Sequence, residues 1–191
     1  MKKIHKILLI LFVLTNSYDF LIAQTYSLHL KQQYNATRTQ VFVDVYITTT
    51  SGSWNMGSAN LVVNFDESNL SFVGRDVSYD GPFDNGANPL IYLDMGSTEI
   101  TILGDKCVNI TINPITSACP PTNGVTVPTT PTRIARLIFN INGDCGSDPG
   151  IAWKTGIGTG TINKWNSGSP CTITNIKGNA SFVNPPPIGS L

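Results

Sequence analysis

The sequence predicts an all-β protein, folded as a single antiparallel β-sandwich of about nine strands in the jelly-roll class. Residues 41–48 alternate strictly, with Val or Ile at every second position, and residues 60–66 repeat the alternation before it resumes at 70–73. β-branched and aromatic residues at a period of two, interrupted by Gly, Ser and Asn, are typical of strands that bury one face. After residue 23, no stretch longer than one turn has helical spacing.

The first four strands are expected at residues 26–30, 40–49, 61–66 and 70–77. Residues 26–30 alternate as Tyr-Ser-Leu-His-Leu, and the turn Glu67-Ser68-Asn69 separates the third strand from the fourth. The segment that follows is rich in Asp, Gly, Asn and Pro as far as Pro89, so it is predicted to be a loop.

The middle of the chain is predicted to hold a hairpin and a long loop. Residues 90–95 and 98–103 are expected to pair around the turn Gly96-Ser97. Residues 107–112 alternate again and form the next strand. Five prolines between residues 113 and 132 exclude a central strand, because proline lacks the N–H that a strand ladder needs.

The last strands are expected at residues 133–141, 151–155, 172–176 and 179–183. The first of these turns Ala, Leu, Phe and Ile inward at alternate positions. The polar residues 163–168 between them are expected to be a loop. Three consecutive prolines then end the sheet, and residues 185–191 are predicted to form a stiff tail or linker.

The first 23 residues have the layout of a secretory signal peptide. Three lysines open the chain, an apolar run covers residues 7–14, and Ala23 precedes Gln24 at a point that fits cleavage. A membrane-spanning helix needs about 20 apolar residues, and the polar residues 16–19 interrupt the run too soon. The alternative is an ordinary N-terminal helix. We therefore expect a soluble exported chain with one domain over residues 24–184 and no membrane span.

Charge is sparse and balanced along the chain. There are 12 basic and 12 acidic residues, and charged residues make up 13% of the sequence. Loss of the leader removes three lysines and Asp19, which leaves nine basic and eleven acidic side chains. Nucleic acid binding calls for a clustered basic surface, so no nucleic acid partner is expected.

Four cysteines remain in the expected mature chain. Export favours disulfides, and four cysteines permit three connectivities. The pairing favoured by proximity in the sequence joins Cys107 to Cys119 and Cys145 to Cys171, and each disulfide would contribute about 2–4 kcal/mol. A zinc site is disfavoured, because no two cysteines have Cys-x-x-Cys spacing and only His29 could assist them.

Two tryptophans are candidate platforms for a glycan, because the CH faces of sugars stack on exposed aromatic rings. Trp165 lies in the polar segment that is expected to be a loop, and Trp54 borders a turn. The alternatives are a Trp165 ring folded over one end of the sandwich and a Trp54 ring at the edge of the core.

Asp80 and Asp84 are weak candidates for calcium ligands, because calcium prefers hard oxygen groups. Asp76 and Asn85 lie in the same segment, yet the spacing lacks the Asp-x-Asp-x-Asp-Gly pattern of a calcium loop. A solvated acidic loop is the favoured interpretation, and no cofactor is expected.

The sequence favours a binding module over an enzyme. A nucleophilic triad needs a base, and His29, the one histidine of the expected mature chain, lies in a predicted strand. A glycosidase needs two carboxylates in a cleft, and acidic pairs occur on any surface. No catalytic residue is predicted.

Four segments together resemble a cohesin-type domain, within the wider group of carbohydrate-binding-module-like sandwiches. Residues 41–47 resemble the family's early strand, and residues 56–70 its succession of small residue, strand, aromatic-Asp pair, turn and leucine. Residues 133–139 resemble the late strand that ends in a buried Phe, and residues 176–182 the closing turn and strand. The matches span residues 26–183.

The resemblance implies binding rather than catalysis. Cohesins hold dockerin modules of polysaccharide-degrading assemblies on one face of the sandwich, and related modules bind glycans. The positions that match this partner-binding face are Ser58, Asn60, Val62 and Asn64. The chain departs from the family at Asn60, where an acidic residue is frequent, and in the long loop that contains Cys119.

The expected function is therefore a non-catalytic extracellular module for protein docking or carbohydrate attachment, in polysaccharide breakdown or at the cell surface. Its expected partner is a dockerin-like protein module or a polysaccharide. A leader ending in Ala-Gln, with the domain close behind, is similar to secreted surface proteins of Gram-negative bacteria. The alternative function is a structural subunit of a surface layer or filament, in which exposed sheet edges pair with neighbours.

Overall fold

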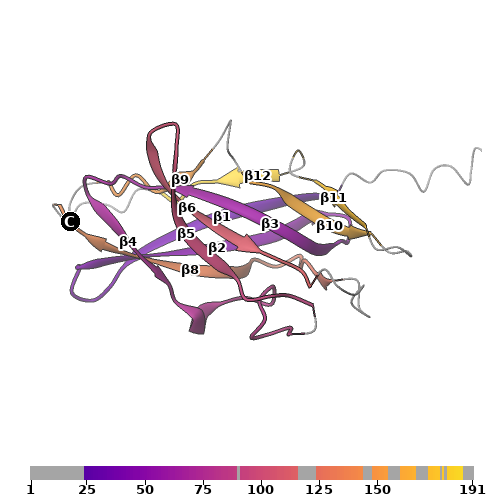
Figure 1. Cartoon of the computed structure of the whole chain (residues 1–191). Coiled ribbons are helices and arrows are strands. Elements are labelled where there is room, and N and C mark those ends of the chain that lie inside the picture. Colours follow the sequence, from indigo (N-terminus) through magenta and orange to yellow (C-terminus); the bar gives the residue numbers. More distant parts are fainter. Residues whose placement is uncertain are drawn as a thin grey trace, which may run out of the picture.

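The structure, a computed structural model, describes residues 24–89, 91–115, 124–143, 148–154, 160–166, 172–176, 178 and 180–186. These residues form two packed sheets that run along the molecule, which confirms the predicted all-β sandwich (Figure 1). The predicted signal peptide, residues 1–23, lies outside the described residues. The described part of the chain contains no helix with the length and hydrophobicity that a membrane crossing needs.

One sheet has five strands in the order β12-β1-β2-β8-β4. The other has the order β11-β10-β3-β6-β5, with the short strands β7 and β9 also paired to β3. A short 3-10 turn, η1 (Val77–Tyr79), follows β4. In chain order the strands are β1 (Thr25–Tyr34), β2 (Gln40–Ser51), β3 (Asn55–Asn64), β4 (Leu70–Arg75), β5 (Gly96–Ile102), β6 (Asp105–Ile112), β7 (Val125–Thr126), β8 (Thr132–Ile141), β9 (Ala152–Trp153), β10 (Ile162–Asn166), β11 (Thr172–Asn175) and β12 (Ala180–Val183).

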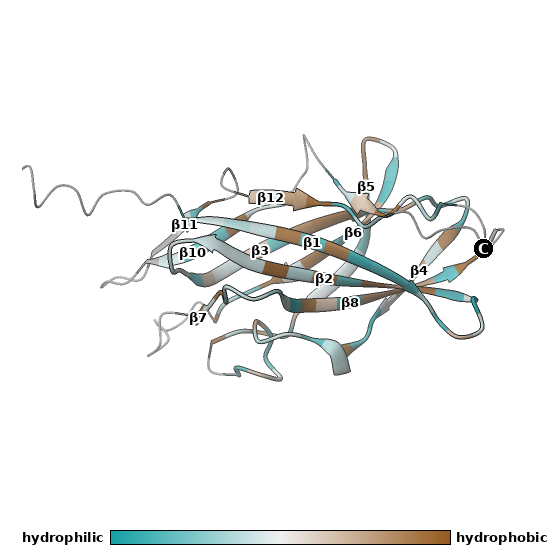
Figure 2. Ribbon diagram, turned by 180° about the vertical axis from the view of Figure 1, so that it is seen from behind, coloured by the Kyte–Doolittle hydropathy of each residue, from teal (hydrophilic) through white to brown (hydrophobic). Residues whose placement is uncertain are grey.

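The core lies between the sheets and is built by the alternation that predicted the strands. In β2 the four residues Val41, Val43, Val45 and Ile47 are fully buried, and this strand pairs with β1 on one side and β8 on the other. Figure 2 shows hydrophobic segments inside β2 and β8 and hydrophilic residues at the turn that joins β1 to β2. Burial of one face thus explains the residue pattern of these strands.

One strand pair departs from the predicted antiparallel arrangement. β12 runs parallel to β1, with Tyr26 opposite Ala180 and His29 opposite Val183. Every other strand pairing of the described residues is antiparallel. The other edge of β1 is occupied by β2, so β12 adds at its remaining edge.

The predicted hairpin at residues 90–103 is wrong. Gly96 opens strand β5 rather than a turn, and the real hairpin joins β5 to β6. Ile91, Tyr92 and Met95 precede it and are buried without forming a strand, whereas Leu93 is 49% exposed. The Tyr92 hydroxyl donates a hydrogen bond to the Met56 carbonyl over 2.7 Å. The Tyr92 ring also packs edge-on against Phe83, with centroids 6.2 Å apart. Both rings belong to the hydrophobic core of the domain.

Candidate docking face

The outer face of the seven-stranded sheet carries the residues that the sequence assigns to partner binding. Ala59, Leu61 and Val63 of β3 point into the core. The alternating positions Ser58, Asn60 and Asn64 therefore lie on the outer face, as predicted. Their role in binding stays a prediction.

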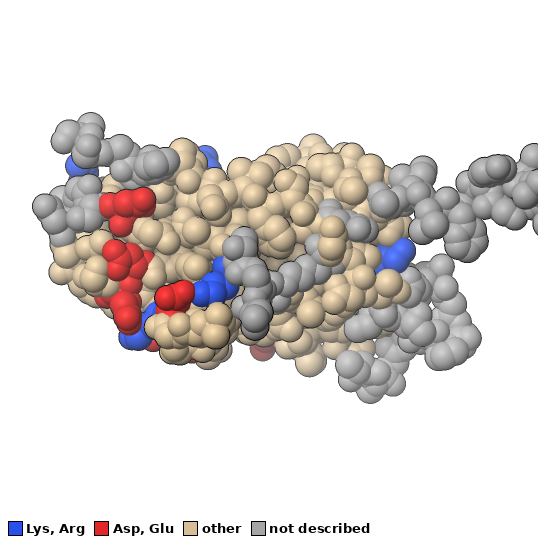
Figure 3. All heavy atoms as spheres, turned by 90° about the horizontal axis from the view of Figure 1, so that it is seen from above, with Lys and Arg blue, Asp and Glu red and all other residues tan. Residues whose placement is uncertain are grey.

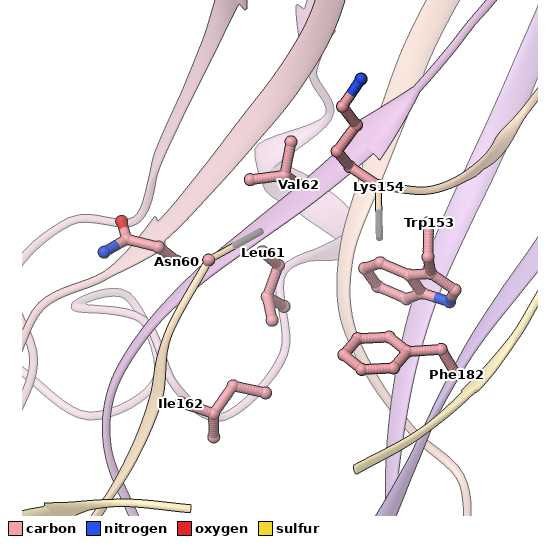
Figure 4. A pocket seen from close by; sticks show the side chains of 8 residues that line it. Asn60, Leu61, Val62, Trp153, Lys154, Ile162 and Phe182 are labelled. Carbon is pink, nitrogen blue, oxygen red and sulfur yellow. The ribbon is translucent and has the colours of Figure 1, made fainter. Parts of the chain in front are cut away.

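Hydrogen bonds hold two of these side chains in place. Asn163 of β10 donates from Nδ2 to Ser58 Oγ over 2.7 Å. The Cys107 thiol of β6 donates to Asn64 Oδ1 over 3.0 Å. Asn60, between them on β3, is exposed, and Figure 4 shows its side chain directed away from Leu61 and Ile162. Asn60 is thus the side chain of β3 best placed to meet a partner.

Val62 shares the outer face but is only 5% exposed. Lys154, just after β9, explains this burial. Its backbone N–H donates to the Val62 carbonyl over 2.9 Å, and its side chain lies beside Val62 (Figure 4) and is itself 9% exposed. Lys154 Nζ is 2.6 Å from Asp105 Oδ2, and this hydrogen bond raises the pKa of Lys154. Val62 is therefore covered and offers no direct contact to a partner.

Strands β6 and β5 extend the face with uncharged polar side chains. Asn109 lies opposite Val62 on one side and Thr98 on the other, and Thr111 lies opposite Asn60. Asn109 Oδ1 is buried and has no hydrogen-bond partner among the described residues. Asn109 and Thr111 are not among the predicted binding positions, although the alternation in residues 107–112 that predicted the strand also predicts their outward direction.

Gly96 lets β5 lie close to β6 at this face. An ideal Cβ at Gly96 would be 2.3 Å from Thr111 Oγ1, which is far inside contact distance. Any larger residue would displace the Thr111 side chain, so the glycine preserves the position of a polar group on the face.

Cys107 is a free cysteine, so the predicted disulfide between Cys107 and Cys119 is not formed. The thiol is fully buried on β6, where it bonds to Asn64. Burial raises its pKa, and the nearby Lys154 ammonium opposes that shift. The remaining cysteines, Cys119, Cys145 and Cys171, lie outside the described residues.

A small pocket opens beside the face, between β3, β9, β10 and β12. Trp153 and Phe182 form one wall, with ring centroids 5.7 Å apart, and Leu61 and Ile162 form another (Figure 4). Its interior of about 10 Å³ is room for no more than one water molecule. This space is too small for a sugar or a cofactor.

Neither predicted glycan platform is a free ring in the structure. Trp54 is 4% exposed and packs in the core against Tyr26, with centroids 5.3 Å apart. Of the two alternatives for Trp54, the structure therefore favours a ring packed at the core over an exposed glycan platform. Trp165 lies on β10 rather than in the predicted loop, and it is partly buried. An ideal Cβ on Gly124 would lie 2.1 Å from Trp165 Cδ1, so this ring edge packs directly on the Gly124 backbone.

The two weak calcium candidates are already engaged with protein groups. Arg75 forms a close ion pair with Asp80 and lies 3.8 Å from Asp84. Asp84 also accepts backbone N–H bonds from Met95 and Gly86. Burial raises the pKa of Asp80 to about 6, against the opposing charge of Arg75. Within the described ranges, no three His, Cys, Asp or Glu side chains come together in a way that could hold a metal ion.

Acidic side chains gather at one end of the molecule (Figure 3). Lys106 lies 3.5 Å from Glu67 and 3.4 Å from Glu99, and Asp105 is paired with Lys154. Three carboxylates therefore share two ammonium groups around the hairpin of β5 and β6. We call this group, Glu67, Glu99, Asp105, Lys106 and Lys154, the acidic end.

Comparison with known proteins identifies the class of fold. No model of a protein family matches the sequence, and no curated protein matches it. Among solved structures, the second type II cohesin module of the cellulosomal adaptor scaffoldin ScaA of Acetivibrio cellulolyticus is similar, with a TM-score of 0.55 at 10% identity over 90% of this chain and 99% of that chain.

Two further cohesins are similar over most of their length. Type II cohesin A11 of Bacteroides cellulosolvens has a TM-score of 0.55 at 10% identity, over 85% of this chain and 98% of that chain. The seventh ScaB type I cohesin of Pseudobacteroides cellulosolvens has a TM-score of 0.52 at 11% identity, over 85% and 92%. The chain folds as a cohesin-type β-sandwich, as the sequence resemblance predicts.

Proposed function

We propose that this chain is a non-catalytic docking module that holds a protein partner on the outer face of its seven-stranded sheet. The observation that supports this most directly is the row of uncharged polar side chains across β3, β6 and β5. Asn60 projects from the row, and Ser58 and Asn64 are fixed by neighbours. Asn and Ser both donate and accept hydrogen bonds, so such a face suits the hydrogen-bonding surface of another protein.

The proposed partner is a dockerin-like module. This follows from the cohesin-type fold and from the family resemblance in the sequence, since cohesins bind dockerins on this kind of face. Asn60 replaces an acidic residue that is frequent in the family, so we expect a neutral hydrogen bond where an ion pair would otherwise form. A neutral contact makes this position less dependent on salt concentration.

Location is part of the same proposal. We propose that residues 1–23 are a signal peptide that directs the chain out of the cell, that residues 24–184 form the docking domain, and that residues 185–191 are a tail or linker. The site of action is extracellular, in polysaccharide breakdown or at the surface of a Gram-negative bacterium.

The other candidate functions have less support. Direct glycan attachment cannot use the Trp54 ring, because that ring is buried in the core. It would depend on the Trp165 ring, which is partly covered by Gly124. Retention of the Trp165→Ala variant on a polysaccharide, compared with the parent chain, tests that role. A structural subunit of a surface layer stays an alternative, which light scattering of the purified chain tests.

The docking proposal is tested by paired variants on opposite sheets. Asn60→Arg places a long charged side chain on the proposed face, and Asn140→Arg makes the same change at an exposed position of β8 on the other sheet. Each chain is immobilised and exposed to the secreted extract of the producing organism. The retained protein is identified, purified and titrated calorimetrically.

A docking module predicts one partner that binds the parent chain and Asn140→Arg alike. Affinity for Asn60→Arg is expected to fall at least tenfold, as for a side chain near the centre of an interface. Equal affinity for all three chains would contradict the proposed face.

A further inference from the structure

The hairpin that joins β5 to β6 has an unusual residue at its tip. Ile102 lies opposite Asp105, so the turn consists of Leu103 and Gly104 alone. Both have positive φ, 55° at Leu103 and 92° at Gly104. Two-residue turns with positive φ at both positions strongly favour Asn, Asp or Gly at the first.

Leucine is disfavoured there for two separate reasons. In the left-handed region the Cβ of an L-residue lies too close to the backbone carbonyl oxygen, so a residue with a bulky side chain rarely adopts this conformation. The side chain is also 79% exposed, more than any other large hydrophobic side chain of the described residues. Neither backbone geometry nor burial within the chain therefore accounts for leucine at position 103, and strain of this kind points to a use outside the fold.

We propose that Leu103 is the apolar anchor that inserts into a pocket of the protein partner when that partner lies on the docking face. The inference rests on the proposed function and adds the contact made at the end of the face. β5 and β6 continue from the face into the hairpin, with Thr98 opposite Asn109 and Ile100 opposite Cys107. Leu103 follows Thr98 by five residues, which corresponds to about 17 Å along a strand. A partner helix of about 12 residues is long enough to contact both positions.

The surroundings of Leu103 define the chemistry of the partner pocket. The acidic end borders the hairpin, and its carboxylates are well exposed: Asp105 by 65%, Glu67 by 55% and Glu99 by 38%. Lys106 and Lys154 are paired with these groups, but two ammonium groups do not neutralise three carboxylates, so the surroundings of Leu103 keep a net negative charge. A pocket that receives Leu103 is therefore apolar inside and rimmed by Lys or Arg. An anionic membrane surface would be repelled by the same carboxylates, so the occupant is a protein.

Two substitutions separate strain from contact. Leu103→Asn relieves the strain and removes the apolar group, so it is expected to raise Tm by about 2–4 °C. Leu103→Ala keeps a strained Cβ and removes the rest of the side chain, so its Tm is expected to stay close to that of the parent chain. A lower Tm for Leu103→Asn would show that Leu103 serves the fold, and would overturn the inference.

Contact is tested with a photoreactive residue, benzoylphenylalanine, placed singly at positions 103, 60 and 140 of the full chain in the producing culture. We expect the same protein to crosslink from positions 103 and 60 and not from 140. That protein, once identified and purified, is expected to bind Leu103→Ala and Leu103→Asn at least tenfold more weakly, and Glu67→Lys more weakly than the parent chain.

The outcomes separate this inference from the proposed function. A protein crosslinked from position 60 but not from 103, or bound equally well by Leu103→Ala, would leave the docking face in place and refute the anchor. A lipid adduct alone at position 103 would refute the anchor in favour of a membrane contact. No adduct at either position would count against both proposals.

Discussion

Arg136 and Asp44 lie opposite each other on β8 and β2 and form a two-point ion pair on the outer face of the five-stranded sheet. Arg136 Nε is 2.7 Å from Asp44 Oδ1, and a terminal guanidinium nitrogen is 2.8 Å from Oδ2. The Tyr79 ring covers the guanidinium at 3.8 Å, and the Phe42 ring lies at 5.4 Å. Both charged residues are more than nine-tenths buried, and the bond to Asp44 raises the pKa of Arg136.

Asp44→Ala is expected to destabilise the domain by about 3–5 kcal/mol, because it leaves the buried Arg136 charge without its partner. Equilibrium unfolding in urea measures the loss. Glu99→Ala is the control: it removes the exposed ion pair with Lys106, and exposed pairs contribute less than about 1 kcal/mol. Equal effects of the two substitutions would show that the Arg136–Asp44 pair is not desolvated as the structure indicates.

Asp80 is expected to make the domain more stable as the pH falls from about 7 toward 4. Burial raises its pKa to about 6, Arg75 opposes the shift, and Asp84 and Asp76 add to it. The folded chain thus binds a proton more tightly than the unfolded chain, so the free energy of unfolding rises as the proton is taken up. The measurement is the difference in unfolding free energy between the parent chain and Asp80→Asn across this pH range.

Asp66 supplies a control with the opposite sign. Hydrogen bonds from Ser68 lower its pKa, so its contribution is present near neutral pH and is lost in acid. The difference between the parent chain and Asp66→Asn should therefore shrink as the pH falls. A flat profile for Asp80→Asn would refute the assigned role of Asp80.

Gly81→Ala is expected to destabilise the domain by about 1–3 kcal/mol, the usual cost of forcing extra atoms into a packed site. An ideal Cβ at Gly81 would be 1.9 Å from the Arg133 carbonyl oxygen, a backbone atom that cannot rotate away. Gly178→Ala is the matched control, because nothing lies within 4 Å of its ideal Cβ. Thermal unfolding of both variants decides whether the segment after β4 is held this closely to β8.

Cys107 is expected to resist alkylation in the folded chain and to react once the chain is unfolded without reductant. Its thiol is fully buried, and burial raises its pKa, so little reactive thiolate is present or accessible. Peptide mapping after iodoacetamide treatment reports the modified residue. Recovery of Cys107 in a disulfide-linked peptide from the unreduced protein would contradict the free thiol.

The strands that bury one face could be predicted from the sequence because one local pattern determines them. β2, β3 and β8 show the alternation directly, and the outward positions Ser58, Asn60 and Asn64 follow from the same period. A pattern of this kind does not distinguish a buried strand from a buried loop. Ile91 and Tyr92 are buried in the core although they belong to no strand, and their apolar side chains led to the mistaken strand at residues 90–95.

The errors at the candidate site arise from contacts between residues far apart in the sequence. Val62 occupies an outward position, but it is covered by Lys154, which lies just after β9 and far from Val62 in the sequence. Trp165 belongs to β10, whose polar residues Asn163 and Lys164 resemble a loop because the strand lies toward the edge of its sheet. The local sequence does not show which distant residues pack against a strand. The burial of Val62 and the strand at Trp165 could therefore not be predicted from the alternation alone.

The pairing of β12 with β1 bears on the order in which the chain can fold. Tyr26 and Ala180 are partners that lie more than 150 residues apart in the sequence. The first strand to be synthesised therefore cannot complete its pairing until the last described strand has been made. Until then, the free edge of β1 presents unpaired backbone groups that invite pairing with another chain. Contacts this distant also slow folding, because a long loop must close before they form. A chain interrupted before β12 would therefore carry an open sheet edge and a tendency to aggregate.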